Sequence, residues 1–372
     1  MNITETAIII CKIWSFTGLP QFKYKNGKFE YKKTKSYVIL TLVVMTNIAF
    51  FIKSLNVTND LMFYLSILQT GSLYSLDIGL IIYSYLKKRK IVIILNDLLM
   101  VTKMVCRVSR NNNLSQNNIS KSLFWYIIVQ VILVAAEFLG ILVFFTLEAK
   151  VYVNLVFYNF ATFFSYNLNV LIFFYLIVVR TIYTSYFNAI TSNSTNDPKT
   201  VIRIFTKLYE ISHNINETFQ VPILLRIFTD FVLSVTTVFY LSVTLYFFPG
   251  VSYYVVLVTV AWLTNILFAI FMMAYFFDQT TEMRNTMTEI IDDLPSSHSL
   301  SKMLSNYKKV KELLRLKLKH EDFCFNVCGF FPLNISFIYM MVAGITMYTI
   351  YLLQFGPINN QKLNPQVQNI GN

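Results

Sequence analysis

Charged residues are scarce in this sequence of 372 residues, because Asp, Glu, Lys and Arg together make up only 13%. Soluble proteins carry roughly 25% charged residues. Hydrophobic residues make up 55% of the chain, and its mean hydropathy is +0.54. This balance excludes an ordinary soluble domain and indicates that most of the chain lies in a lipid bilayer.

Cysteine and histidine are also rare, with four Cys and three His in the whole chain. The spacing of Cys11, Cys106, Cys324 and Cys328 makes neither a disulfide framework nor a zinc site, so we expect small, buried or membrane-adjacent thiols. The sequence contains no H-E-x-x-H, no G-x-S-x-G and no phosphate-binding glycine loop. We therefore expect no enzymatic activity and no cofactor or metal.

The long apolar runs contain little proline or glycine. A spanning helix needs about 20 mostly apolar residues, and seven segments meet this requirement: 37–55, 61–85, 122–146, 151–182, 221–248, 251–277 and 333–355. None of the eight Pro lies in the middle of a segment, which disfavours a transporter with broken helices. The runs are continuous and do not alternate, so the predicted fold is all-α, with seven transmembrane helices.

Two of these helices are expected to project beyond the bilayer. The fourth continues as RTIYTSYFNAI, and the fifth is preceded by a stretch of helical period that starts just after Pro198. Positive residues from Lys87 onward are assigned to the connection after the second span. The acidic run 289–293 is expected to be a linker that leads into a basic amphipathic helix.

Positive charge is distributed very unevenly between the connections. The net charge is +12 with 31 Lys and Arg, and nearly all of these residues lie before the first span or in the second, fourth and sixth connections; the exceptions are Lys53, Lys150, Arg226 and Lys362. The positive-inside rule then places the N-terminus in the cytoplasm and, after seven spans, the C-terminus outside. This orientation is opposite to that of G-protein-coupled receptors. The basic excess indicates a cytoplasmic face beside anionic lipid, with no nucleic acid partner.

The last span has polar residues on one helical face. Steps of three and four residues from Thr346 reach Thr349, Ile350, Leu353 and Gln354. One interpretation is a packing face that hydrogen-bonds to a neighbouring helix. The other is a pore wall, in which hydroxyl and amide groups replace part of the hydration shell of an ion. One helix cannot enclose a channel, so the second interpretation requires several subunits.

Polar and ionisable groups inside the other spans are candidates for function. Arg226 and Asp230 are four residues apart and are predicted to pair. Asp77, in the second span, is assigned to packing or gating. The candidates for a ligand site are four further residues in the third, fourth and sixth spans: Glu137, Tyr158, Trp262 and Asn265. Each of these four residues has packing as its alternative role.

The C-terminal part of the chain resembles the insect gustatory receptors, which are related to the insect odorant receptors. Their last span carries Thr-Tyr, five hydrophobic residues and Gln-Phe. Here Tyr348, Gln354 and Phe355 match in register, whereas Met347 replaces the usual Thr. Upstream, Cys328-Gly329-Phe330 is similar to the segment that leads into this helix, and Gly18-Leu19-Pro20 is similar to the opening of the family.

The resemblance implies a ligand-gated, poorly selective cation channel in the plasma membrane, with four related subunits around a pore made by the last helix. It assigns Gln354 and Phe355 to the lining or closure of the outer pore, and it implies a small-molecule tastant as ligand. Sugar receptors typically carry Glu where this chain has Thr349, so bitter, fructose-like and other contact stimuli stay open. The alternative is a seven-helix receptor that signals through a cytoplasmic partner without its own pore.

The predicted spans and their orientation divide the chain into three parts, and the resemblance adds the expectation of a packed anchor. Residues 1–36 form a cytoplasmic N-terminal segment, and residues 356–372 form a polar extracellular tail. Residues 37–355 form the transmembrane receptor domain, in which the segments 183–220 and 278–332 are expected to build a packed cytoplasmic anchor.

Overall fold

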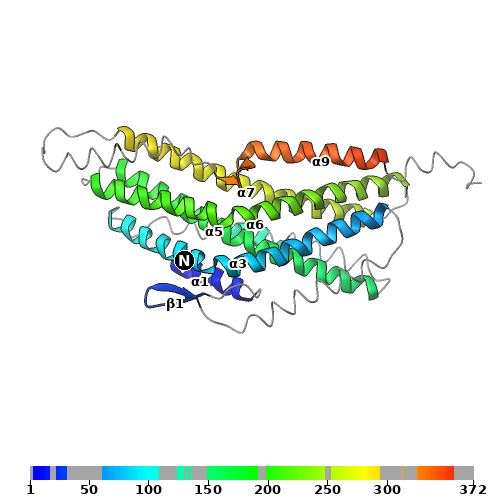
Figure 1. Cartoon of the computed structure of the whole chain (residues 1–372), viewed down its shortest axis with the longest axis horizontal. Coiled ribbons are helices and arrows are strands. Elements are labelled where there is room, and N and C mark those ends of the chain that lie inside the picture. The colour runs from blue at the N-terminus through cyan, green and yellow to red at the C-terminus, as the bar shows by residue number, and fades with distance from the viewer. Residues whose placement is uncertain are drawn as a thin grey trace, which may run out of the picture.

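The computed structural model describes residues 3–16, 22–31, 61–108, 124–129, 131–132, 135, 149–191, 198–247, 253–293, 312 and 325–355. It is a bundle of long helices that run roughly along one axis (Figure 1). The predicted first span, 37–55, and most of the third, 122–146, lie outside the described residues. Among the described residues nearly all are helical, and the strands form two small hairpins.

Four helices are much longer than a bilayer requires. They are α3 (Leu61–Val108), α5 (Ala149–Thr191), α6 (Pro198–Phe247) and α7 (Tyr253–Asp293), with 48, 43, 50 and 41 residues. At 1.5 Å per residue each measures about 60–75 Å, whereas the hydrocarbon core is about 30 Å thick. Each helix is therefore long enough to cross a membrane and to extend beyond it.

The last helix, α9 (Ile335–Phe355), is shorter and has 21 residues. It lies beside only one half of the long helices (Figure 1). Length and composition mark four stretches within the described residues as candidate membrane spans: Asn169–Ile190, Thr200–Tyr246, Thr259–Glu289 and Ile335–Gln354. Of these, the stretch in α9 is the least covered by the rest of the protein, with 22% of its residues buried.

The structure extends α3 well beyond the end of the predicted second span. The sequence predicts a connection from Lys87 onward, but the helix continues to Val108. Its continuation buries one apolar stripe, made by Ile91, Ile94, Leu95, Leu98, Val101 and Val105. The basic residues interrupt the hydropathy without interrupting the helix, because side chains such as Arg89 point to solvent while the stripe packs against the bundle.

The prediction of a linker at residues 289–293 is wrong, because α7 continues through this acidic run to Asp293. Carboxylates do not break a helix, and helical propensity of Glu is high. In α6, Pro222 lies inside one continuous helix. Proline has no backbone N–H, so α6 lacks the hydrogen bond that would reach back to Thr218.

The N-terminal elements form a small unit on the side of α3. They are α1 (Ile3–Phe16) and an antiparallel hairpin of β1 (Phe22–Lys25) and β2 (Lys28–Tyr31). The hairpin turns at Asn26-Gly27, whose φ values are 51° and 79°. This dipeptide is the preferred one for a tight hairpin, since both residues tolerate positive φ.

One side chain of α3 makes two hydrogen bonds to the hairpin. Asn96 Oδ1 accepts a hydrogen bond from the Phe29 N–H at 2.7 Å, and Asn96 Nδ2 donates to the Phe29 carbonyl at 3.0 Å. The Phe29 ring is buried, and Lys88 lies 4.5 Å from the centre of the Tyr31 ring. These elements lie toward one end of the bundle, and the last turn of α9 lies at the other (Figure 1).

The main core joins α1, the hairpin and the long helices. Its most continuous part is in α5, where every residue from 171 to 179 is buried. Where α5 and α6 continue toward the N-terminal unit, Tyr186 donates a hydrogen bond to the Val201 carbonyl, and Lys90 pairs with Glu217 at 2.5 Å. Burial also raises the pKa of the Cys11 thiol to about 12, so this thiol stays protonated.

Candidate functional site: the last helix and the cavity behind it

One face of α9 packs against α6 and α7. It is formed by Phe337, Met341, Ile345 and Thr349, which follow one another at intervals of four residues and are all buried. Side chains at this spacing lie above one another on a helix, so together they form a single ridge. This ridge fixes which side of α9 is left uncovered.

The backbone of α9 lies close to a side chain of α6. A Cβ added at Gly344 would lie 3.1 Å from Phe231 Cε2, so glycine makes room for the Phe231 ring. The same ring packs edge-on against Tyr348, with 5.6 Å between ring centroids and an interplanar angle of 89°. Tyr348, a residue of the family motif, therefore helps to dock α9 against α6.

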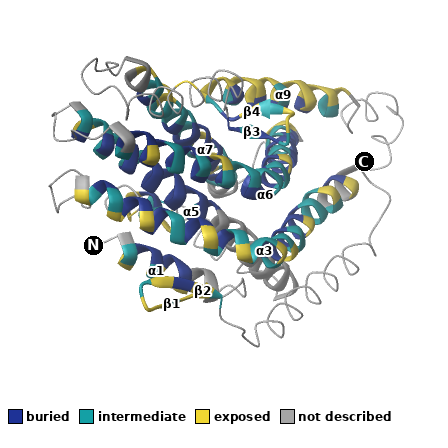
Figure 2. Ribbon diagram, turned by 60° about the vertical axis from the view of Figure 1, so that its left-hand side comes forward, coloured by how far each residue is buried: buried dark blue, intermediate teal, exposed yellow. Residues whose placement is uncertain are grey.

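The opposite face of α9 is uncovered and mostly apolar (Figure 2). Its large exposed side chains include Tyr339 at 74%, Met347 at 55% and Ile350 at 50%. Contiguous apolar surface of this kind is covered by another partner in the functional protein. For a membrane helix that partner is lipid or another polypeptide.

The structure divides the face that the sequence analysis assigned to a pore. Thr346, Ile350 and Gln354 are exposed on the uncovered side, whereas Thr349 is 5% exposed and points into the bundle. Leu353 is half-buried against a small cluster formed by Leu65, Phe239 and Val243. Phe355 is the last residue of α9.

The motif before α9 is a tight turn. Strands β3 (Asn326–Val327) and β4 (Phe331–Pro332) pair antiparallel, and the Phe330 N–H donates to the Val327 carbonyl at 2.9 Å. Between them, Cys328 and Gly329 have φ values of 52° and 77°. Glycine fits this left-handed conformation, and its presence in the motif thus has a structural reason.

Two further contacts set the start of α9. The Asn334 side chain accepts a hydrogen bond from the Phe337 N–H at 3.1 Å, as an N-cap residue does. The Phe331 and Phe337 rings stack with centroids 4.6 Å apart. Phe330, by contrast, is 75% exposed. The motif therefore sets the direction in which α9 leaves the hairpin.

The four predicted ligand-binding residues do not form one described site. Glu137 lies outside the described residues, and Tyr158 lies in α5 at a position whose side chain is not described. Trp262 packs half-buried against the main core, and Asn265 is fully buried in α7. The ligand-binding assignment stays a prediction.

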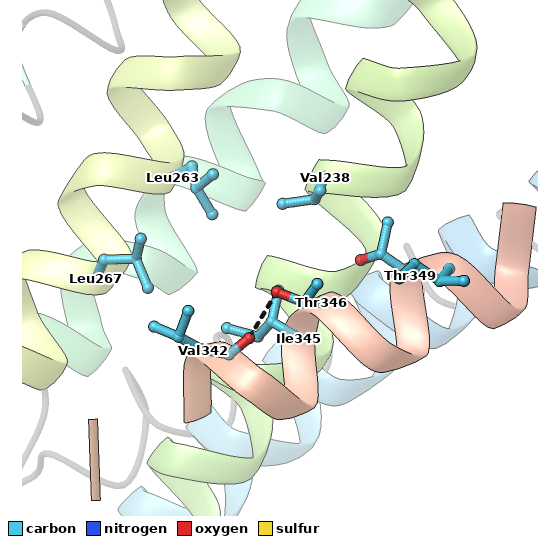
Figure 3. A pocket seen from close by; sticks show the side chains of 8 residues that line it. Val238, Leu263, Leu267, Val342, Ile345, Thr346 and Thr349 are labelled. Carbon is cyan, nitrogen blue, oxygen red and sulfur yellow. Dashed lines mark hydrogen bonds between the residues drawn. The ribbon is translucent and has the colours of Figure 1, made fainter. Parts of the chain in front are cut away.

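A cavity of ≈ 210 Å³ lies between α6, α7 and α9 (Figure 3). Its lining consists of Val238, Leu263, Leu267, Val342, Ile345, Thr346, Thr349 and Ile350. Thr346, Thr349 and Ile350 are candidate pore residues predicted from the sequence, whereas the other five lining residues were not predicted. Aliphatic residues are common in any membrane helix, so no sequence signal distinguishes those that surround a cavity.

The two hydroxyl groups in this lining differ in their hydrogen bonds. Thr346 Oγ1 donates to the Val342 carbonyl at 2.9 Å. Thr349 Oγ1 is buried and has no hydrogen-bond partner, as is also true of the hydroxyl groups of Thr218 and Thr237 in α6. A buried hydroxyl without a partner is unusual and unfavourable.

A second buried polar group lies between α3 and α6. Arg226 Nε donates to Asp230 Oδ2 at 2.7 Å, which confirms the predicted pair. Asp77 of α3 is 1% exposed, has no hydrogen-bond partner at either carboxylate oxygen and interacts electrostatically with Arg226. One guanidinium is therefore paired with Asp230 and also attracts the buried carboxyl group of Asp77. The described residues contain no cluster of His, Cys, Asp and Glu that is arranged to hold a metal ion.

Both the sequence and the architecture of this chain are similar to those of known proteins. The family model described as 7tm Chemosensory receptor matches residues 8–359. Among solved structures, the insect olfactory receptor OR5 from Machilis hrabei has a TM-score of 0.71 and 16% sequence identity, over 95% of this chain and 98% of that one. The structure of OR5 in complex with eugenol has a TM-score of 0.72 and 15% identity, over 95% and 99% of the two chains. A comparison with curated protein sequences gives no match.

The structural similarity establishes a shared fold, and the family match extends over nearly the whole chain. The protein is thus a multi-pass membrane chemoreceptor. As the motifs around Cys328 and Gln354 predicted, the chain belongs to the 7tm chemosensory receptor family.

Proposed function

We propose that this chain is a subunit of a ligand-gated cation channel that detects tastants on contact, with α9 of each subunit lining a shared pore. The observation that carries the proposal is the position of α9 at the edge of the bundle, docked by one face and uncovered on the other (Figure 2). Four such helices around one axis would cover each other's free faces, and the family resemblance implies this number.

The chemistry of the uncovered face suits a weakly selective pore. Thr346 and Gln354 offer a hydroxyl and an amide that can replace part of the hydration shell of a cation. Ile350 and Leu353 can close the path by excluding water. The helix has no charged residue, so no fixed charge would select strongly between cations. Phe355 is assigned to the outer end of the pore by the family resemblance.

The similarity to a receptor solved in complex with eugenol supports a small organic molecule as ligand. Membership of the gustatory branch is supported by Tyr348, Gln354 and Phe355 in the register of its motif. Thr349 stands where sugar receptors typically carry Glu, so the proposed stimulus is a bitter, fructose-like or other contact tastant. Glu137, Tyr158, Trp262 and Asn265 remain the candidate residues for its pocket.

The proposed orientation places the N-terminus in the cytoplasm and Phe355 near the outer surface of the plasma membrane. Two observations support it: the positive residues cluster on one set of connections, and the N-terminal unit lies at the opposite end from the last turn of α9. The halves of the helices beside the N-terminal unit would then form the cytoplasmic anchor. An epitope tag after residue 372 should bind antibody on intact cells. A tag that is labelled only after permeabilisation would refute this orientation.

The pore is tested by cysteine substitution at Gln354. Cells that express Gln354→Cys receive a tastant found by ligand screening, followed by a positively charged thiol reagent from the outside. We expect the evoked current to fall irreversibly, because the modified side chain adds charge and bulk to the pore. The matched control is Leu257→Cys in the first turns of α7, which is exposed (66%) and is not part of α9.

Two results would contradict the pore assignment. One is a surface-expressed Gln354→Cys receptor whose current and ion selectivity match the wild type after treatment with the reagent. The other is a tastant response that persists without any current through the receptor, as the alternative of a non-conducting receptor predicts.

A further inference from the structure

Two carboxyl groups inside the bundle lie beside one guanidinium, but only one of them is hydrogen-bonded to it. Arg226 Nε donates to Asp230 Oδ2 at 2.7 Å on the same helix. Within the described part of the chain, neither oxygen of Asp77 on α3 has a hydrogen-bond partner, and Asp230 Oδ1 has none either. A buried carboxylate without a partner is far more costly than a buried hydroxyl group, because it carries a full charge. The cluster is therefore only partly satisfied.

The contacts between α3 and α6 place the Asp77 carboxyl group at the level of the guanidinium. A Cβ added at Gly79 would lie 3.1 Å from Leu225 Cδ1, and the Thr229 hydroxyl donates to the Ser72 carbonyl at 3.4 Å. These two contacts show that the helices run antiparallel here, and position 77 lies between them along α3. The electrostatic interaction between the carboxyl group and the guanidinium agrees with this register.

Helix α6 has a weak point one turn before Arg226. Pro222 lies inside the helix and interrupts its backbone hydrogen bonding, and helices bend most readily at prolines. The part of α6 before Pro222 is joined to α5, where Tyr186 donates a hydrogen bond to the Val201 carbonyl. A bend at Pro222 therefore moves mainly the part of α6 that contains Arg226.

This later part of α6 is also the part to which α9 is docked. The Phe231 ring, on the turn after Arg226, packs against Tyr348 and lies close to Gly344. Helix α6 contacts both α3 and α9 and lies between them (Figure 1). A movement of the guanidinium relative to α3 is therefore transmitted to α9.

We propose that Arg226 is a switch that exchanges its carboxylate partner between Asp230 on its own helix and Asp77 on α3. In the arrangement described here, the guanidinium is bonded within α6. In the second arrangement it is bonded to Asp77, this part of α6 turns relative to α3 as the helix bends at Pro222, and α9 follows through Phe231. Tastant binding changes the balance between the two arrangements.

The exchange conserves charge and protons. One guanidinium neutralises one carboxylate, and the other buried carboxyl group holds a proton. Here Asp77 holds it; when Arg226 turns to Asp77, one proton is transferred from Asp77 to Asp230. The remaining titratable group in electrostatic contact with Arg226 and Asp230 is the buried Tyr126 hydroxyl, which stays neutral in both arrangements. The two arrangements therefore differ only in which helix holds the guanidinium.

Substitution by asparagine fixes each arrangement, because the amide mimics the protonated carboxyl group. Asp77→Asn keeps the pair described here, and Asp230→Asn leaves Asp77 as the carboxylate partner. The exchange is measured without current, as the distance between spin labels at Leu68→Cys on α3 and Met347→Cys on α9, which are both exposed. The labels are introduced into the full chain in lipid nanodiscs, after its four native Cys have been replaced by Ser, and labelled subunits are diluted with unlabelled ones.

We expect two different distances in Asp77→Asn and Asp230→Asn, and both distances in the protein with neither substitution. Thermal unfolding shows whether each variant is folded. Pro222→Ala leaves the charges unchanged but restores a backbone N–H to α6. Combined with either asparagine substitution, it should bring the two distances closer together. An undiminished difference would exclude the bend at Pro222.

The link to gating rests on the proposed function, because it requires α9 to line the pore, whereas the exchange does not. In cells, the tastant concentration for half-maximal current should shift in opposite directions in Asp77→Asn and Asp230→Asn, by at least about fivefold each. Asp97→Asn is the matched control, because it makes the same substitution on α3 at a half-buried position beside the N-terminal hairpin. It should cause no shift.

The outcomes separate the switch from the channel. If the spin-label distances differ as expected but the receptor carries no current, the channel is wrong and the switch stands. If both asparagine variants give the same distance, the switch is wrong. It is also wrong if the two half-maximal concentrations shift in the same direction, as a purely structural ion pair predicts, or do not shift at all.

Discussion

Arg226 and Asp230 form an ion pair inside the bundle, one turn apart on α6. The Nε–Oδ2 distance is 2.7 Å, and both side chains are 2% exposed. Asp77 of α3, also buried, interacts electrostatically with the same guanidinium. Buried charges are costly unless they are paired, so Arg226 is the group on which the two carboxyl groups depend.

Replacing Arg226 should therefore be far more harmful than replacing Asp77. Arg226→Met leaves two carboxyl groups buried without their cation, and we expect a loss of about 3–5 kcal/mol in folding stability. Asp77→Asn keeps the size of the side chain and leaves one arginine with one carboxylate, which should cost much less. Thermal unfolding of the purified chain measures both variants. Equal losses would contradict the assignment of Arg226 as the shared partner.

The glycine at position 344 is expected to be required for the docking of α9. Gly344→Leu places a branched side chain where even a Cβ would lie 3.1 Å from Phe231 Cε2. Overpacking of this kind costs roughly 1–3 kcal/mol, and it should push α9 away from α6. The expected results are a lower unfolding temperature and an altered tastant response.

A second substitution should partly restore the stability that Gly344→Leu loses. Phe231→Ala removes the ring that the new side chain would meet, so the double variant Gly344→Leu with Phe231→Ala should recover part of the lost stability. Additive losses in the double variant would show that the two residues do not interact.

Removal of the Thr349 hydroxyl should stabilise the protein when no ligand is present. Thr349→Val has nearly the same shape, and it eliminates a buried hydroxyl that has no hydrogen-bond partner. The expected gain is about 1 kcal/mol, read as a higher midpoint of thermal unfolding. Thr280→Val provides the contrast, because its buried hydroxyl donates to the Phe276 carbonyl at 2.7 Å, and its loss should bring no comparable gain. A destabilised Thr349→Val would indicate that the hydroxyl has a partner in the protein.

The N-terminal hairpin should detach from α3 when Asn96 is truncated. Asn96→Ala removes both hydrogen bonds to Phe29 and leaves the N–H and carbonyl of that residue without their partner. We expect faster proteolytic cleavage in residues 22–31, followed over time by mass spectrometry. Lys103→Ala, on the exposed side of the same helix, is the control and should leave the cleavage rate unchanged. Equal rates for Asn96→Ala and wild type would refute the attachment.

Local properties of the chain were predictable without any tertiary information. The continuous apolar runs predicted helices that are long enough to span, and five of the helices so predicted are described in full or nearly so. The pairing of Arg226 with Asp230 follows from their spacing on one helix, and the structure confirms it. The motifs around Cys328 and Gln354 depend only on the order of residues, and they predicted the family that the family model confirms.

Prediction failed where hydropathy was taken to mark the end of a helix. The basic residues after Lys87 and the acidic run 289–293 lower the hydropathy, yet α3 and α7 continue through them. Charged residues keep a helix intact while its apolar stripe is buried against neighbouring helices. That stripe gains its stability from elements far away in the sequence, so a local window does not detect it.

The sequence by itself determined the helical class, the candidate spans, the distribution of positive charge and the family, because each depends on residue type and spacing along the chain. Only the tertiary structure decided that Thr349 turns into the bundle while Gln354 faces outward, and that Leu263 and Ile345 border one cavity. A helical wheel places residues around one axis, but the packing of α6 and α7 against α9 decides which part of that wheel is covered.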